Sequence, residues 1–106
     1  MTVRTRSLKK FKAGTTLYIR IEVRDATDST HPLFTPASNP AILIRDPSGT
    51  VQINYSSMTQ IDTGHYSYTY QTLTTSAIGV WSIGFKVTNV SLTVYTPERD
   101  GFELVP

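Results

Sequence analysis

Apolar and polar residues alternate with a period of two along most of the chain. The clearest example is the segment Thr15 to Arg24, in which every second residue is aliphatic. These aliphatic residues are Leu17, Ile19, Ile21 and Val23. Successive side chains of a β-strand point to opposite faces, so this alternation predicts a strand with one buried face. No segment of the sequence shows sustained helical spacing, and the pattern therefore predicts an all-β fold.

Turn signals separate further segments of the same kind. The other predicted strands are Val3–Phe11, Ala41–Arg45, Val51–Tyr55, Gly64–Leu73, Gly79–Thr88, Val90–Val94 and Gly101–Val105. Residues 46 to 49 (Asp-Pro-Ser-Gly) match the preferences of a β-turn, a second turn is expected at Thr88-Asn89, and residues 25 to 39 predict a long loop. Roughly seven to nine strands with such turns are typical of an antiparallel sandwich or barrel.

The segment of residues 62 to 70, DTGHYSYTY, is the densest in functional side chains. As a strand, it would present Tyr66, Tyr68 and Tyr70 on one face and His65, Ser67, Thr69 and Gln71 on the other. The spacing Asp62-x-Gly64-x-Tyr66 resembles the tyrosine corner of immunoglobulin-like domains, whose tyrosine hydroxyl bonds to backbone upstream. We therefore expect Tyr66 and Tyr68 to serve the core and a structural corner. Replacing Tyr66 by Phe would then remove one hydrogen bond.

The resemblance extends over about residues 13 to 96. Four segments follow one another in this region: the alternating strand, the turn at residues 46 to 49, the tyrosine segment and Gly79-x-Trp81-x-x-x-Phe85. Their order is similar to that in the immunoglobulin-like β-sandwich repeats of bacterial and phage surface proteins. These repeats are of the filamin and macroglobulin type. The resemblance implies an antiparallel immunoglobulin-like sandwich over residues 13 to 106, preceded by residues 1 to 12 as a basic arm or first strand. Trp81 and Phe85 share the phase of Ile83, so we expect both in the core.

Composition and motifs limit the catalytic and metal-binding sites that the chain can form. The 106 residues include no cysteine, which excludes disulfides, thiol nucleophiles and zinc-cysteine sites. His65 has no acid placed to orient it, because we expect Asp62 to hold the corner turn. The loop carboxylates Asp25 and Asp28 more often cap turns than bind calcium. We therefore predict no catalytic residues, no metal site, no cofactor and no enzymatic activity.

Charge and exposed aromatic residues predict an interaction surface. Tyr18 and Tyr95 are in outward phase, and Arg20 and Arg24 lie near Tyr18; Tyr and Arg are enriched in protein interfaces. The candidate interface residues are Arg4, Arg6, Lys9, Lys10, Lys12, Tyr18, Arg20, Arg24 and Tyr95. The basic segment, opposite in sign to residues 98 to 103, lacks a base-reading motif. We expect it to be a solvated strand or a tether to an acidic protein surface, with no specific nucleic-acid partner.

These observations predict a non-enzymatic module for contacts with other protein subunits in a homo- or hetero-oligomeric assembly. Residues 1 to 12 lack the apolar run of a secretory signal or a membrane span, so we expect a protein made in the host cytoplasm and no membrane partner. A stand-alone sandwich of this kind suits a small virion component, such as a phage head-decoration, neck or tail protein. The alternative is a carbohydrate-binding or adhesion module that uses Tyr18 and Tyr95.

Overall fold

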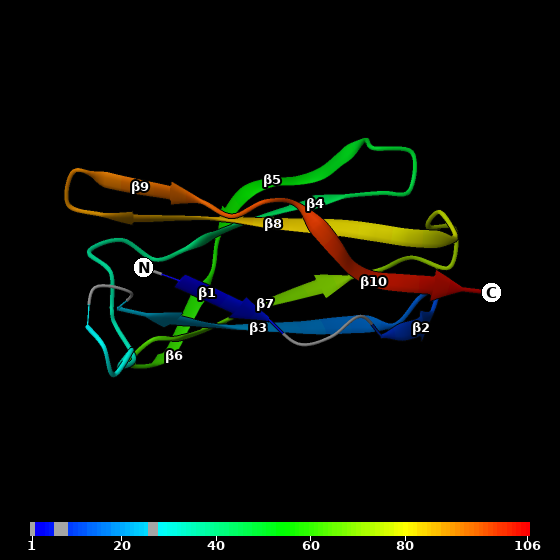
Figure 1. Ribbon diagram of the computed structural model, residues 1–106. Coiled ribbons are helices and arrows are strands. Elements are labelled where there is room, and N and C mark those ends of the chain that lie inside the picture. The colour runs from blue at the N-terminus through cyan, green and yellow to red at the C-terminus, as the bar shows by residue number, and fades with distance from the viewer. Residues whose placement is uncertain (1, 6–8, 26–27) are drawn as a thin grey trace.

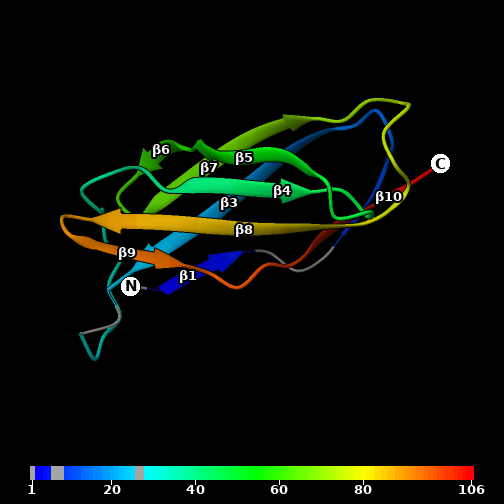
Figure 2. The same ribbon diagram turned by 90° about the horizontal axis from the view of Figure 1, so that it is seen from above.

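Two β-sheets pack face to face in the computed structural model, which describes residues 2–5, 9–25 and 28–106 (Figure 1). The four-stranded sheet has, in spatial order, β1 (Thr2–Thr5), β3 (Thr16–Arg24), β7 (His65–Gln71) and β6 (Thr59–Asp62). The six-stranded sheet has β2 (Lys10–Lys12), β10 (Arg99–Val105), β8 (Gly79–Asn89), β4 (Ala41–Arg45) and β5 (Val51–Ser57), with β9 (Leu92–Tyr95) also paired to β8. Figure 2 shows β5, β4, β8 and β9 side by side, with the strands of the second sheet running at an angle to them.

This architecture confirms the all-β sandwich that the sequence predicts, and the described pairing is antiparallel except between β2 and β10. Both sheets are open, which distinguishes the fold from a closed barrel. Only Met58 separates β5 from β6, and its side chain is buried. The chain thus passes from one sheet to the other almost without interruption, and the ten described strand segments form nine continuous strands if β5 and β6 are taken as one.

The N-terminal segment, predicted as one strand over residues 3 to 11, contributes to both sheets. β1 pairs antiparallel with β3 through residues Thr2 to Thr5, whereas β2 pairs parallel with β10. Residues 6 to 8, which include Arg6, lie outside the described part of the chain. A uniform alternation of polar and apolar residues contains no signal for such a change of partner, because either sheet satisfies the same pattern.

The core lies between the sheets and is formed by the inward phase of each strand. Trp81 and Phe85 are both buried there. The Trp81 ring stacks on Phe102 with 5.5 Å between ring centroids, and its Nε1–H donates a hydrogen bond of 2.9 Å to the Ala77 carbonyl. A buried indole needs such a partner for its N–H. The aromatic packing therefore keeps Trp81 away from the surface.

The tyrosines of β7 also point inward. Tyr66, Tyr68 and Tyr70 lie opposite Ile21, Ile19 and Leu17 of β3, respectively. Tyr66 is fully buried, and the other two pack partly buried against the core. These contacts identify the tyrosine row as one face of the four-stranded sheet.

Gly64 fixes the turn that precedes this strand. Its φ of 72° favours glycine, and a Cβ at this position would lie 2.8 Å from the Val23 carbonyl oxygen. The Val23 N–H donates a hydrogen bond of 2.7 Å to the Gly64 carbonyl. The turn therefore packs directly on β3, and a side chain at Gly64 would force the two apart.

The predicted corner hydrogen bond of Tyr66 is not made in this structure. Among the described residues, its hydroxyl has no hydrogen-bond partner of normal geometry. Burial raises the pKa of Tyr66 above its ordinary value. The nearby side chain of Thr35 lowers this pKa, but by less than burial raises it. Asp62, expected to hold the corner turn, contacts the His65 ring with its carboxylate instead. Tyr66 thus contributes to the core through its ring.

Candidate functional site

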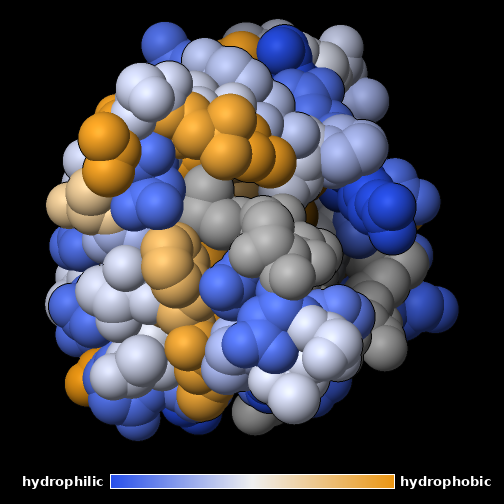
Figure 3. Space-filling view, turned by 60° about the vertical axis from the view of Figure 1, so that its left-hand side comes forward, coloured by the Kyte–Doolittle hydropathy of each residue, from blue (hydrophilic) through white to orange (hydrophobic). Residues whose placement is uncertain are grey.

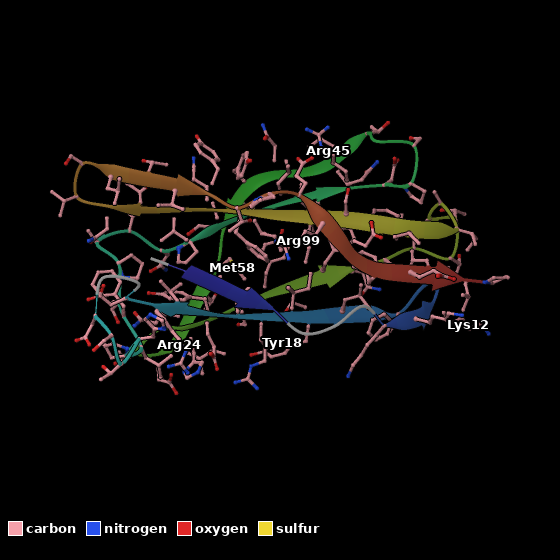
Figure 4. All side chains as sticks on the ribbon, viewed as in Figure 1. Lys12, Tyr18, Arg24, Arg45, Met58 and Arg99 are labelled. Carbon is pink, nitrogen blue, oxygen red and sulfur yellow. The ribbon has the colours of Figure 1, made fainter. Side chains whose placement is uncertain are left out.

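The outer face of β3 carries three of the predicted interface residues. Tyr18 and Arg20 are exposed and Arg24 is half-buried. Tyr18 and Arg24 extend from the face of β3 that is turned away from the second sheet (Figure 4). The sequence alternation therefore places these side chains where a partner could reach them.

Arg24 belongs to a charged cluster, which we define as Glu22, Arg24, Asp62 and His65. Arg24 Nε lies 3.1 Å from one Glu22 oxygen, and His65 Nε2 lies 3.5 Å from the other. His65 Nδ1 contacts Asp62. The hydrogen bond from Arg24 lowers the pKa of Glu22 below its ordinary value. Arg24 is thus paired with Glu22 inside this cluster, and Tyr18 and Arg20 are its more accessible neighbours.

The cluster corrects one sequence-based interpretation. His65 was expected to have no acid to orient it, but each of its ring nitrogens faces a carboxylate. The contact between Glu22 and His65 could not be predicted from the sequence, because it depends on the register in which the two residues lie opposite each other. The described residues contain no group of three or more His, Asp or Glu side chains arranged to hold a metal ion. They also form no helix long and apolar enough to cross a membrane.

A second group lies on the outer face of the six-stranded sheet and consists of Tyr55, Lys86 and Tyr95; we call it the aromatic cluster. Tyr95 is exposed, and Tyr55 and Lys86 are half-buried. The rings of Tyr55 and Tyr95 meet edge to face with 5.7 Å between centroids. Lys86 Nζ lies 5.2 Å from the centroid of the Tyr55 ring, within the range of a cation–π contact. Lys86 and Tyr95 are also paired across β8 and β9. The cluster combines a cation with exposed aromatic surface.

The position of Tyr55 differs from the simple alternation of Val51, Ile53 and Tyr55. In the register of β4 and β5, Asn54 and Tyr55 together lie opposite Leu43, which is a β-bulge. Tyr55 has a φ of 50°, an uncommon value for a bulky residue. The extra residue brings Tyr55 beside Lys86 on the outer face. Sequence analysis missed Tyr55 because a period of two cannot represent this inserted residue.

The two aromatic residues predicted to be exposed do not form one surface. Tyr18 lies on the outer face of the four-stranded sheet, whereas Tyr95 belongs to the six-stranded sheet. Both are exposed. Each therefore belongs to a different candidate surface, and only Tyr95 has a second aromatic ring packed against it in the described residues.

The terminal charges also lie closer together than the sequence suggests. Lys9, Lys10 and Lys12 are at least partly exposed, and Lys10 pairs in register with Glu103. The parallel pairing of β2 with β10 brings the basic and acidic segments side by side within one molecule. The side chain of Arg4 and the whole of Arg6 lie outside the described part of the structure.

The hairpin formed by β8 and β9 exposes apolar side chains at one end of the molecule. Val90 and Leu92 are 83 % and 57 % exposed. Residues 87 to 97 contain no charged side chain. Figure 3 brings this end of the molecule forward and shows apolar surface beside strongly hydrophilic surface. The strand edge at this end is thus uncharged and flanked by exposed apolar residues.

The turn of this hairpin is strained and lies two residues beyond the expected position. Leu92 pairs with Asn89, so the two turn residues are Val90 and Ser91 rather than Thr88 and Asn89. Val90 has a φ of 56°, which costs about 1–3 kcal/mol for a residue other than glycine. The Asn89 side chain accepts a hydrogen bond of 3.0 Å from the Ala37 N–H. This contact keeps Asn89 in the ladder and moves the turn to Val90.

These features supply the evidence on function, since no protein-family model matches the chain and a search of curated proteins found no relative.

Proposed function

We propose that this protein is a non-enzymatic structural module that acts through contacts with other protein subunits in an assembly. The observation that carries the proposal is the hairpin of β8 and β9, which has an uncharged edge and exposes Val90 and Leu92. Exposed apolar side chains beside an unpaired strand edge favour association with another protein. No cofactor, nucleic acid or membrane is required for this role.

The strand order supports a finer assignment, an immunoglobulin-like sandwich. The order β1-β3-β7-β6 corresponds to strands A, B, E and D of that fold, and β10-β8-β4-β5 corresponds to G, F, C and C′. In this correspondence Tyr66 belongs to strand E, whereas the tyrosine corner belongs to strand F. The missing corner bond of Tyr66 is consistent with that position.

Within this proposal, the protein is a small virion component, such as a phage head-decoration, neck or tail protein. A compact sandwich with exposed apolar residues at one end can attach to a larger particle while the rest of its surface stays solvated. The molecule is elongated and measures 44 × 21 × 20 Å. The hairpin lies at one end of the long axis (Figure 1). Attachment through one end would leave both outer sheet faces available to further partners.

Cosedimentation with particles from the protein's own source tests the proposal, and the chain offers a matched pair of variants. Leu92 lies in the hairpin and Leu73 lies in the connection from β7 to β8, and they are 57 % and 61 % exposed. We expect Leu92→Asp to weaken particle binding by about tenfold or more and Leu73→Asp to have little effect. Equal effects of the two variants, or no binding by the unmodified protein, would contradict the proposal.

A second candidate function, carbohydrate binding, is supported by the aromatic cluster. An exposed ring such as that of Tyr95 offers a flat apolar face, and Lys86, which pairs with Tyr95 across β8 and β9, adds hydrogen-bond donors. A glycan array followed by titration of any glycan that binds tests this function. Loss of binding in Tyr95→Ala, with Tyr18→Ala as the control on the other sheet, would support it.

A further inference from the structure

The outer edge of β9 pairs with no other strand in the described part of the chain. In the described residues β9 pairs with β8 alone, through a register that contains no bulge. The Thr96 N–H donates a hydrogen bond of 2.9 Å to the Phe85 carbonyl. Hydrogen-bonded and non-hydrogen-bonded pairs alternate in an antiparallel ladder. Residues 92, 94 and 96 of the β9 segment therefore direct their N–H and C=O groups toward β8, and Thr93 and Tyr95 direct theirs outward.

The length of this edge is limited at both ends. Ser91 is a turn residue, and Pro97 has no N–H to donate. The open window between them is centred on Val94, with Thr93 and Tyr95 on either side. An antiparallel strand that is centred on the same residue can use every outward backbone group in this window. The strand that fits this condition most simply is another β9.

We propose that β9 pairs antiparallel with β9 of a second copy of this chain, about a two-fold axis at Val94. Thr93 of each copy then lies opposite Tyr95 of the other, and the two pairs form four backbone hydrogen bonds. The two six-stranded sheets become one continuous sheet across the dimer. This inference rests on the proposed function, because it names the contact through which the assembly begins.

The other described edges of the molecule carry features that oppose such pairing. β5 is interrupted by the bulge at Tyr55, and the edge strand β6 ends in the charged residue Asp62. β2 carries Lys10 and Lys12, and the sequence of the edge strand β1 includes Arg4. Bulges and charged side chains are devices that protect strand edges. The edge of β9 carries neither, so it is the edge best suited to pair with a strand.

Charge does not oppose the pairing of two identical edges. The strand next to this edge, β8, carries the cation Lys86, which is paired with Tyr95. In the dimer the two copies of Lys86 are separated by three strand spacings, about 14 Å. This distance exceeds the Debye length of about 8 Å in physiological salt. The Thr93 and Tyr95 side chains of the two copies meet instead, and they extend the aromatic cluster across the axis.

A disulfide trap tests the register, and the absence of cysteine from the chain makes the result simple to interpret. At the axis, Val94 lies opposite Val94 of the second copy as a non-hydrogen-bonded pair, with Cα atoms about 4.5 Å apart. This separation is within the range that a disulfide spans. Leu92 lies on the same face of β9 and is more exposed, but the two copies of Leu92 are remote from one another in this register. We expect Val94→Cys to form a disulfide-linked dimer about tenfold or more faster than Leu92→Cys under mild oxidation.

A second pair of variants tests the backbone hydrogen bonds directly. Thr93→Pro removes an outward N–H and leaves the bonds between β8 and β9 intact. Thr93→Val keeps the N–H and removes the hydroxyl, which lies 3.2 Å from the Thr88 hydroxyl. In sedimentation velocity at several protein concentrations, we expect Thr93→Pro to raise the dimer dissociation constant by about tenfold or more. Thr93→Val should change it little, and tryptophan fluorescence checks that both variants are folded.

The outcomes separate this inference from the proposed function. A protein that stays monomeric at high concentration, or a Leu92→Cys variant that cross-links as fast as Val94→Cys, overturns the pairing of two β9 strands. If such a monomer still binds particles and Thr93→Pro abolishes that binding, the edge pairs with a strand of another protein and the second copy is excluded. A dimer that Thr93→Pro disrupts, but that binds no particle, supports the pairing and contradicts the virion role.

Discussion

Tyr66 has the buried position of a core residue, but in the described part of the chain it lacks the hydrogen bond expected of a corner tyrosine. Tyr66 is fully buried on the inner face of β7, as its phase in the strand requires, yet its hydroxyl lacks a normal hydrogen bond among the described residues. A buried hydroxyl without a partner is destabilising, because the group loses its hydrogen bonds to water on folding. The ring of Tyr66 therefore stabilises the fold, and its hydroxyl does not.

This arrangement predicts the effect of removing the hydroxyl. A corner hydrogen bond would make Tyr66→Phe destabilising by about 0.5–1.5 kcal/mol. Because the bond is absent, we expect Tyr66→Phe to leave the free energy of unfolding unchanged or to raise it by up to about 1 kcal/mol. Urea denaturation, with Tyr70→Phe as a partly buried control, measures the difference. A clear loss of stability in Tyr66→Phe would show that the hydroxyl has a partner in solution.

At the scale of elements, the hairpin of β4 and β5 depends on one aspartate. Asp46 Oδ1 accepts hydrogen bonds of 2.9 Å and 3.0 Å from the N–H groups of Ser48 and Thr50, and one of 2.6 Å from the Ser48 hydroxyl. The Ser48 hydroxyl is the main cause of a pKa for Asp46 below its ordinary value. The folded hairpin therefore favours the ionised carboxylate, as expected of aspartate at the first position of a turn.

The sign of this shift predicts a dependence on pH. The stabilisation that Asp46 provides is present above the pKa of its carboxyl in the unfolded chain, and it is lost as the pH falls through the lower folded value. Ser48→Ala should reduce the melting temperature at neutral pH, and the difference from the unmodified protein should shrink at about pH 3. Thermal unfolding at both pH values measures this, with Ser57→Ala on β5 as the control. A difference that does not depend on pH would contradict the role of the carboxylate.

The elements also show which features a sequence can predict. Alternation identified β3, β7 and β8 and their buried faces, because burial of apolar side chains determines the phase of a strand. It missed the bulge at Tyr55 and the shifted turn at Val90, because both depend on contacts with distant parts of the chain. The same limit applies to the candidate site. Tyr95 was predicted to be exposed, but its partners Tyr55 and Lys86 became known only from the register of three strands.

For the whole molecule, the N-terminal segment is part of both sheets. β1 pairs with β3 over four residues, and β2 pairs with β10 over three. The Glu103 N–H also donates a hydrogen bond of 2.9 Å to the Lys9 carbonyl. The described parts of residues 1 to 12 therefore support the fold directly, in addition to any contact their cations make with a partner.

Deletion of residues 1 to 12 should consequently impair folding. The deletion removes an outer strand from each sheet and exposes the apolar residues that those strands cover, so we expect the melting temperature to fall by about 5 °C or more. Circular dichroism during heating measures the change. A variant with Lys9, Lys10 and Lys12 replaced by Gln is the control, because it removes the charges and keeps the strands. An unchanged melting temperature in the deletion variant would show that the segment acts only as an arm.

The parallel pairing of β2 with β10 has a mechanical consequence. Tension applied between the two ends of the chain would pull β2 backward and β10 forward along their shared direction. This tension would load the hydrogen bonds between these strands in shear, and it would load all of them at the same time. The hydrogen bond from the Ala13 N–H to the Val105 carbonyl would be loaded with them. Bonds loaded together must break together, whereas the bonds of a hairpin pulled from its open end break one after another. The molecule is thus built to resist force along the line that joins its ends.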